Sequence, residues 1–195
     1  MTEINSDIFK AYDVRGLYPG ELNEDTFRLL GRAFAAFLGP GTVAVTRDMR
    51  LSSPSLTKAF IDGVTLQGVN VRDGGLGGTD MMYYAVASAG LIGGAMITAS
   101  HNPKQYNGCK MVKAEAFPLS GESGIREMKE MLLSGSLPAP SATPGTVTPL
   151  AIMAPYVDHV MSFIDPTVIQ PFNTVLDAGS GIAGLVAPHL FDRLP

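Results

Sequence analysis

The chain has 195 residues, of which 46% are hydrophobic and 16% charged, and its formal net charge is −4. This composition is typical of a globular domain, and the acidic balance argues against nucleic acid or an acidic membrane surface as a partner, since both attract concentrated lysine and arginine. The single cysteine, Cys109, excludes a disulfide within the chain, and we expect it to pack rather than to do redox chemistry. Neither a bilayer-length apolar stretch nor a basic, apolar signal segment at Met1 is found, which favours a cytoplasmic location.

Expected strands and helices alternate over residues 1–135, which predicts an α/β fold, a layered sheet domain flanked by helices. The first helix has the clearest limits, because Asn23 can cap its start and the Gly-Pro pair at 39–40 ends it. The other expected elements, in chain order, are a strand at 43–45, a helix at 54–67, a strand at 69–71, a helix at 81–88, strands at 94–98 and 106–112, and a helix at 122–133.

Residues 136–150 are rich in proline, glycine, serine and threonine, which predicts a linker or exposed connection. Residues 151–195 then start a second α/β unit, with a helix at 156–163, a strand at 174–176 and a glycine-rich turn at 177–181 before another helix. Such a turn could hold a phosphate, but it lacks the full nucleotide-binding fingerprints and we interpret it as structural. About 45 residues are fewer than the ~100 of a usual domain. We therefore expect a truncated second domain, whose uncovered apolar surface pairs with a second copy or stays mobile.

The polar loop after the expected strand at 94–98 carries most of the chemistry-bearing side chains. It presents a hydroxyl, an imidazole and an amide at Ser100, His101 and Asn102, and Lys110 follows shortly after. Loops held by a rigid scaffold commonly carry function. We expect the Asn-Gly pair at 107–108 to form a tight turn that folds Lys110 back toward Ser100.

Two chemistries could use this loop. Ser100 could be a hydrolase nucleophile, but His101 is its immediate neighbour, and a base must approach the hydroxyl from across the site. The other histidines, His159 and His189, lie far downstream, and no Gly-x-Ser-x-Gly elbow surrounds Ser100. A phosphorylated Ser100 instead needs cations, amide donors and a metal around it, and the residue types of the loop suit that need better. We therefore favour phosphoryl transfer.

A family resemblance supports this interpretation. The string Thr-Ala-Ser-His-Asn-Pro at 98–103, followed by Tyr-Asn-Gly-Cys-Lys at 106–110, resembles the phosphoserine loop of the α-D-phosphohexomutases, the phosphomannomutase/phosphoglucomutase family. The string Phe-Lys-Ala-Tyr-Asp-Val-Arg-Gly at 9–16 is similar to the motif with which these enzymes begin. Within it, Arg15 is a fixed fork of donors suited to phosphate oxygens, and Tyr12 offers a hydroxyl on a rigid ring. The resemblance covers nearly all of this chain but less than half of a typical family member.

Three other segments match the family less closely. At 46–53, Arg47 and Arg50 could extend a positive rim, but we interpret the segment as mostly structural, with one of its two serines capping the next helix. At 77–80, the prolines of many relatives are missing, and the final aspartate is expected to cap the helix that follows. The Gly-Glu-Ser-Gly string at 121–124 mimics the family's sugar-contacting loop, but it lacks a residue and fits a helix start.

The resemblance implies an isomerase that interconverts hexose 1-phosphate and hexose 6-phosphate through a hexose bisphosphate intermediate. The phosphate on Ser100 would also provide an oxygen to Mg²⁺, whose aspartate ligands are absent from this chain, so we expect this chain alone to be inactive. Lys110 would transfer a proton or stabilise charge, while His101 and Asn102 would orient the loop. In full, the implied catalytic residues are Ser100, Lys110, His101 and Arg15, and the implied phosphate-binding residues are Tyr12, Arg15, Asn102 and Lys110.

Two alternatives stay open. One is a phosphoglucosamine mutase, although that branch commonly has an acidic residue where Tyr106 stands. The other is a non-catalytic module that binds a phosphosugar without turnover. The sequence does not select between mannose and glucose, because the family's sugar-recognition loop is absent.

Overall fold

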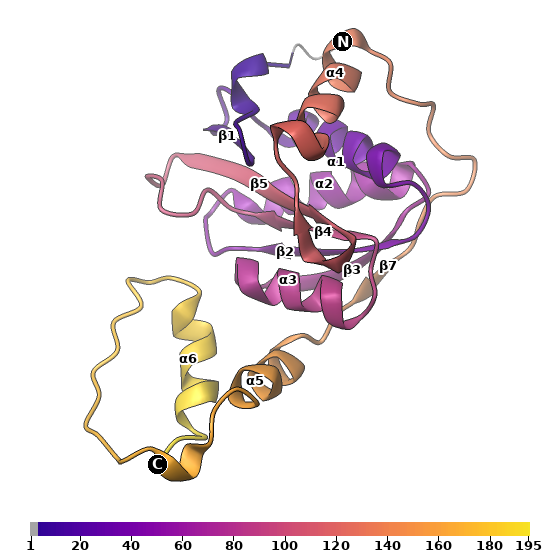
Figure 1. Ribbon diagram of the computed structural model, residues 1–195. Coiled ribbons are helices and arrows are strands. Elements are labelled where there is room, and N and C mark those ends of the chain that lie inside the picture. Colours follow the sequence, from indigo (N-terminus) through magenta and orange to yellow (C-terminus); the bar gives the residue numbers. More distant parts are fainter. Residues whose placement is uncertain (1–3) are drawn as a thin grey trace.

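The centre of the fold is a mixed β-sheet with helices on both faces, and the computed structural model describes residues 4–195 (Figure 1). The strand order is β1-β5-β4-β2-β3-β7, with β6 paired to β5. The strands β4, β2, β3 and β7 run parallel, whereas β5 is antiparallel to both β4 and β1. Their bounds are β1 Val14–Leu17, β2 Thr42–Arg47, β3 Asn70–Leu76, β4 Gly93–Ile97, β5 Tyr106–Lys113, β6 Phe117–Pro118 and β7 Val147–Pro149.

Helices cover the sheet from two sides. Figure 1 shows α1 and α2 on one face and α3 on the other, and each side has its own buried apolar cluster. On the first side, the rings of Phe34 and Phe60 lie 5.7 Å apart, and on the second, Met81 and Met96 are buried. The helices are α1 Glu24–Leu38, α2 Ser53–Leu66, α3 Thr79–Ser88, α4 Arg126–Ser134, α5 Met153–Met161 and α6 Ala183–Phe191, and the shorter turns are η1 Ser6–Ile8, η2 Ala114–Ala116, η3 Gly121–Ile125 and η4 Pro166–Val168. The predicted α/β fold class is thereby confirmed.

Two central strands bring distant loops to one edge of the sheet. The parallel strands β2 and β4 are neighbours, with Arg47 opposite Ile97 in the register. The next residue, Asp48, donates its backbone N–H to the carbonyl of Ile97 over 3.1 Å. Ligands of α/β sheets bind at the carboxyl ends of such strands, because the loops that leave neighbouring strands meet there.

The structure confirms one predicted helix cap and corrects two others. Asn23 does cap α1, with its side-chain oxygen accepting from the backbone N–H of Thr26 over 3.1 Å. Ser52 is the N-cap residue of α2, but its side chain makes no capping hydrogen bond. Its hydroxyl instead accepts a hydrogen bond from the side chain of Asn107 on β5. The residue before α3 is Gly78 rather than Asp80, which lies inside the first turn.

Residues 136–150, predicted as a linker or connection, are attached to the first domain. Their strand β7 adds a parallel edge to β3, and the backbone N–H of Ser141 donates to Leu66 over 2.8 Å. The backbone N–H of Gly145 likewise donates to Thr65 over 2.8 Å. This connection therefore runs along the sheet domain before the chain reaches α5.

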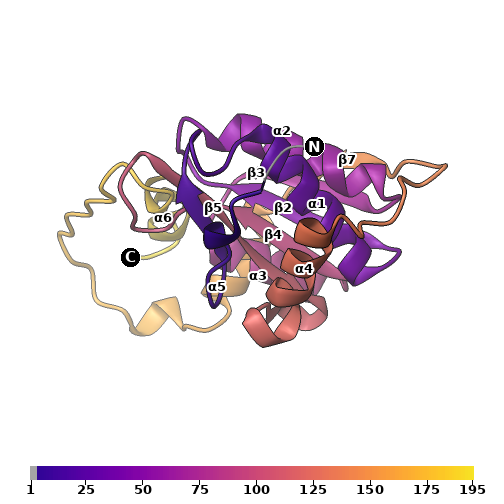
Figure 2. The same ribbon diagram turned by 90° about the horizontal axis from the view of Figure 1, so that it is seen from above.

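Residues 151–195 contain helices but lack the strand expected at 174–176. The stretch between η4 and α6 is an extended loop that forms no ladder within the described residues, and Val175 is 97% exposed. Figure 2 shows this loop and α6 on one side of the sheet domain. Across residues 4–195, no helix has both the length and the apolar character needed to cross a membrane.

Candidate active site

Ser100 lies in a tight turn directly after β4, with an exposed side chain. Its φ of 54° is in the left-handed region, which costs roughly 1–2 kcal/mol for a residue with a Cβ atom. The turn is held because the backbone N–H of Ser100 donates to Thr98 Oγ1 over 2.9 Å, and the N–H of Asn102 donates to the Ala99 carbonyl over 3.0 Å. Backbone strain of this kind concentrates at functional sites.

His101 does not form a hydrolase-type relay with this serine. Its Nδ1 lies 3.4 Å from Ser100 Oγ, and both side chains are exposed. In the described part of the chain, His101 makes no hydrogen bond to a carboxylate that would orient its ring. His159 is far away in α5, where it stacks on Tyr84 with ring centroids 4.8 Å apart. The geometry therefore agrees with the preference for a role other than general base.

A cationic cluster stands beside the turn. Arg15, on β1, donates to Asn102 Oδ1 and to Asp13 Oδ2, each over 2.5 Å. Lys110, on β5, places its Nζ 3.8 Å from the same oxygen of Asp13. The antiparallel pairing of β1 with β5 brings these side chains together, and one carboxylate between two cations leaves the cluster positive. The structure thus brings Arg15, Asn102 and Lys110 together around Asp13, and their predicted roles stay predictions.

The route by which Lys110 reaches the cluster differs from the prediction. The Asn-Gly pair at 107–108 is not a turn but part of β5, and both residues are buried. Asn107 donates from Nδ2 to Ser52 Oγ over 2.8 Å and to Ser53 Oγ over 3.0 Å. Gly108 provides space, since a Cβ atom there would lie 2.2 Å from the carbonyl oxygen of Val14. Strand pairing, rather than a hairpin, therefore positions Lys110.

The pocket at the turn has a volume of about 470 Å³. Ser100, Asn102 and Lys104 line it from the turn, and Gly181 and Ile182 line it from the residues before α6. Tyr12 is 74% exposed and lines a separate pocket of about 460 Å³ together with Lys110. Tyr12 is therefore near the cationic cluster but outside the pocket that contains Ser100.

Two charged residues of the site were not recognised from the sequence as parts of it. The side chains of Asp48 and Arg50 are only 7% and 11% exposed, and their ion pair of 3.2 Å lies under the Ser100 turn. Arg50 therefore does not extend a positive rim over the site. Its position could have been inferred from an Arg-Asp-x-Arg string that begins at the last residue of a buried strand, next to the strand that leads to Ser100.

Residues 6–134 match the sequence profile described as phosphoglucomutase/phosphomannomutase, alpha/beta/alpha domain I. The chain belongs to this family. It is 41% identical over 188 residues to a phosphomannomutase of Escherichia coli, covering 95% of this chain and 40% of the relative. It is 40% identical over 187 residues to a protein of Xanthomonas campestris named phosphohexose mutases, covering 96% of this chain and 42% of that relative.

A solved structure from this phosphohexomutase family has the same fold. The phosphoglucomutase/phosphomannomutase family protein of Burkholderia thailandensis superposes with a TM-score of 0.88 at 33% identity, covering 98% of this chain and 43% of that chain. The family resemblance predicted from the two motifs is confirmed. This phosphohexomutase-family chain spans about 40% of the length of the curated relatives it matches.

The magnesium ion implied by the family has few ligands available here. Among residues 4–195, no group of three or more histidine, cysteine, aspartate or glutamate side chains could hold a metal ion. The nearby carboxylates are already engaged, because Asp13 is shared by Arg15 and Lys110, and Asp48 pairs with Arg50. A hard cation prefers carboxylate and phosphate oxygens. The described residues would therefore provide only an oxygen on Ser100, and they do not by themselves fit a complete magnesium site.

Cys109 packs in the sheet between the two strands that carry the site. It is buried opposite Val14 and Ile97. Burial raises the pKa of its thiol well above the ordinary value, and the negative charge of Asp13 raises it further. A protonated, buried thiol is a poor nucleophile, which agrees with the expected packing role.

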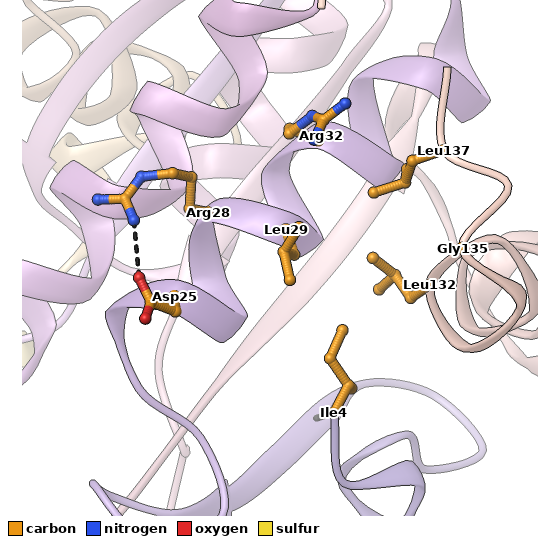
Figure 3. Close-up of a pocket in the computed structure, with 8 residues that line it drawn as sticks. All are labelled: Ile4, Asp25, Arg28, Leu29, Arg32, Leu132, Gly135 and Leu137. Atoms are coloured by element: carbon orange, nitrogen blue, oxygen red, sulfur yellow. Dashed lines mark hydrogen bonds and ion pairs between the residues drawn. The ribbon is translucent and has the colours of Figure 1, made fainter. Parts of the chain in front are cut away.

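Another pocket, of about 460 Å³, lies away from the serine turn between α1 and the end of α4 (Figure 3). Figure 3 shows Leu29, Leu132 and Ile4 around one apolar space, with the Arg28–Asp25 ion pair of 2.9 Å at its edge. This pocket is similar in volume to the one at Ser100, but it contains none of the residues that the two family motifs contribute. The chemistry of the lining, rather than the volume, identifies the serine turn as the candidate active site.

Proposed function

We propose that this chain is the phosphoserine-bearing part of a hexose phosphate mutase, which interconverts hexose 1-phosphate and hexose 6-phosphate. The observation that carries the proposal is the exposed, strained Ser100 on a turn whose Asn102 accepts a hydrogen bond from Arg15, while Lys110 shares the carboxylate of Asp13 with Arg15. A phosphate on this hydroxyl would meet fixed positive charge, and electrostatic stabilisation is the main contribution a protein makes to phosphoryl transfer. The names of the relatives, phosphomannomutase and phosphohexose mutases, support the same substrate class.

In this proposal the phosphate moves twice. The bond between phosphorus and Ser100 Oγ breaks while phosphorus bonds to the free hydroxyl of the sugar monophosphate, which yields a hexose bisphosphate. The bisphosphate then reorients in the site, and Ser100 accepts its other phosphoryl group, so no phosphate is consumed. Arg15 would stabilise the charge on the transferred group, Lys110 would either stabilise that charge or, in its neutral form, accept the hydroxyl proton, and Asn102 would keep the turn oriented through its bond to Arg15.

Mg²⁺ is part of the proposal as a counter-ion of the Ser100 phosphate, with its remaining ligands coming from outside residues 4–195. Tyr12 is proposed to contact the sugar phosphate from the neighbouring pocket. The cytoplasmic location expected from the sequence stays a prediction, as does self-association through residues 151–195. The 195-residue chain alone is expected to show no turnover, because residues 4–195 contain no group of side chains that could complete a metal site and catalysis requires all groups in proximity.

Phosphopeptide mapping of the protein made from its complete reading frame tests the proposal. We expect phosphate on Ser100 after incubation with a hexose bisphosphate, and a loss of mannose 1-phosphate conversion of at least ~1,000-fold in Ser100→Ala. Ser134→Ala, on the exposed face of α4, is the matched control and should retain activity. Phosphate on another residue, or full activity in Ser100→Ala, would refute the proposal, and phosphosugar binding without any transfer would favour the non-catalytic module.

Turnover with glucosamine phosphate in place of hexose phosphates tests the remaining alternative. We expect the complete protein to convert mannose 1-phosphate or glucose 1-phosphate faster than glucosamine 1-phosphate. The opposite preference would assign the protein to the phosphoglucosamine mutases.

A further inference from the structure

One guanidinium group donates to four backbone carbonyl oxygens in and directly after the serine turn. Arg50 Nη1 donates to the carbonyls of Pro103 over 2.8 Å and Tyr106 over 3.1 Å. Its Nη2 donates to the carbonyls of Ser100 over 2.9 Å and Asn102 over 2.7 Å. Three peptide groups of the turn and that of Tyr106, the first residue of β5, are thus oriented by a single side chain that comes from the adjacent loop, after β2.

A buried carboxylate fixes that side chain in turn. Asp48 Oδ1 accepts from the backbone N–H of Arg50 over 3.0 Å and from Ser53 Oγ over 2.6 Å. Its Oδ2 accepts from Arg50 Nε over 3.2 Å and from Thr98 Oγ1 over 2.7 Å. Because Thr98 Oγ1 itself accepts the backbone N–H of Ser100 over 2.9 Å, a continuous set of hydrogen bonds runs from Arg50 to the serine.

Asp48 and Arg50 line the Ser100 pocket, but their burial and hydrogen bonding leave little of either side chain free to contact a substrate. With 11% of its side chain exposed and both its terminal nitrogens bonded to carbonyls, Arg50 has little donor capacity left for a phosphate. The negative charge of Asp48 also offsets the positive charge of Arg50. The planar fork of arginine can serve several acceptors at once, whereas the ammonium group of lysine is a compact point charge with three donors.

We propose that Arg50 is a positioning residue of the phosphoserine turn. It draws the loop carbonyls to one side, and with Asp48 and Thr98 it holds Ser100 in its left-handed conformation. The phosphate on Ser100 then faces Arg15 and Lys110 rather than the negative ends of the loop peptides. This inference rests on the proposed function, since it assigns a geometric cause to the reactivity of the same serine.

The test uses the full 195-residue chain with phosphoserine incorporated at position 100. The second pKa of phosphoserine is ordinarily about 6, and the cationic cluster should hold it lower. In Arg50→Lys we expect the ³¹P signal of this phosphate to titrate at a pH about 0.5 higher than in the parent chain. Amide hydrogen exchange at residues 100–106 should be at least ~10-fold faster, while β2 and α1 keep their protection.

Arg32→Lys is the matched control. Arg32 also donates to a backbone carbonyl, that of Pro138 over 2.7 Å, but at a distance from the serine turn. This variant should leave the ³¹P titration and the exchange at 100–106 unchanged. Thr98→Val removes the bridge between Asp48 and the N–H of Ser100 without removing a charge. If Arg50→Lys fails to fold, the ³¹P titration and the exchange at 100–106 are measured on Thr98→Val instead.

The outcomes separate this inference from the proposed function. An unchanged ³¹P titration and unchanged exchange at 100–106 in folded Arg50→Lys, or in Thr98→Val, would overturn the positioning role even if phosphopeptide mapping finds Ser100 phosphorylated. Phosphate mapped to another residue overturns the proposed function, and this inference with it. Altered signals in Arg50→Lys together with phosphorylated Ser100 support both.

Discussion

The guanidinium of Arg15 donates to the side-chain oxygen of Asn102 over 2.5 Å, although 87 residues separate them in the sequence. The same guanidinium donates to Asp13 over 2.5 Å, so one side chain ties the start of the chain to the serine turn. Arg15 is also only 16% exposed. Its two acceptors therefore fix its orientation before a phosphate binds.

Arg15→Lys is expected to lower kcat/KM of the complete protein by about 10- to 100-fold, which corresponds to losing one charge-assisted hydrogen bond. A lysine keeps the charge but cannot donate to both acceptors in the plane of the original fork. Steady-state conversion of mannose 1-phosphate measures the effect. Arg28→Lys is the control, because Arg28 forms an exposed ion pair in α1, and equal activity of the two variants would contradict the prediction.

Much of the first domain was predictable because its signals are local. Asn23 marks the start of α1, and the short apolar run before Ser100 became β4. The two family motifs also identified the side chains that meet at the site. Arg15 and Lys110 then come together because β1 and β5 pair, a long-range event that local turn signals did not describe.

The parts that were missed depend on partners far away in sequence. Arg50 binds backbone carbonyls, and because every residue has a carbonyl oxygen, the sequence does not show which residues Arg50 will bind. The expected strand at 174–176 has suitable residues, but a strand forms only with a neighbour, and the described residues provide none. The Asn-Gly pair at 107–108 was read as a turn because its composition is typical of one, whereas burial and pairing placed it in β5.

Gly108→Ala tests the close approach between β1 and β5. A Cβ atom at this position would lie 2.2 Å from the carbonyl oxygen of Val14 and 3.0 Å from that of Thr98. Both neighbours are backbone atoms, one in β1 and one directly after β4, and neither can move aside easily, so we expect the free energy of unfolding to fall by about 3 kcal/mol. Urea denaturation of the 195-residue chain measures this change.

Gly20→Ala provides the comparison for that variant, since an added Cβ atom there meets nothing within 4 Å. Its free energy of unfolding should stay within about 0.5 kcal/mol of the parent value. Equal stability of Gly108→Ala and Gly20→Ala would show that the two strands can separate freely, against the packing seen here.

Tyr156 attaches α5 to α3 by donating its hydroxyl to Asp80. Burial raises the pKa of Tyr156, and the hydrogen bond and negative charge of Asp80 raise it further. A pKa that is higher in the folded state means that the contact stabilises the fold fully below the ordinary tyrosine value of about 10. That stability is lost as the pH rises through the raised pKa.

Thermal unfolding followed by circular dichroism at pH 9 and pH 11 measures this dependence. Between pH 9 and pH 11 the Tm of Tyr156→Phe should fall less than that of the parent chain, because the phenylalanine ring cannot ionise. Tyr12→Phe is the control, since Tyr12 is 74% exposed, and it should behave as the parent chain does. If the Tm of Tyr156→Phe falls as much as that of the parent chain, ionisation of Tyr156 is not the cause of the pH dependence.

The last prediction concerns the exposed apolar side chains of the segment after α5. Phe163, Phe172 and Val175 are 74%, 78% and 97% exposed, and the backbone around Val175 forms no strand pair within the described residues. Apolar surface and unpaired extended backbone both favour association. We expect this segment to pair with a second copy as concentration rises, or otherwise to remain mobile, while the sheet domain stays stably folded.

Light scattering over a concentration series, combined with hydrogen exchange, decides between these outcomes. Val175→Lys places a charge on the extended backbone and should reduce the apparent mass at high concentration. Leu51→Lys is the matched control, because Leu51 is 100% exposed on the sheet domain and stands outside the segment. A chain that stays monomeric at high concentration, with residues 163–178 as protected as β2, would contradict the prediction, because the segment would then be covered by its own chain.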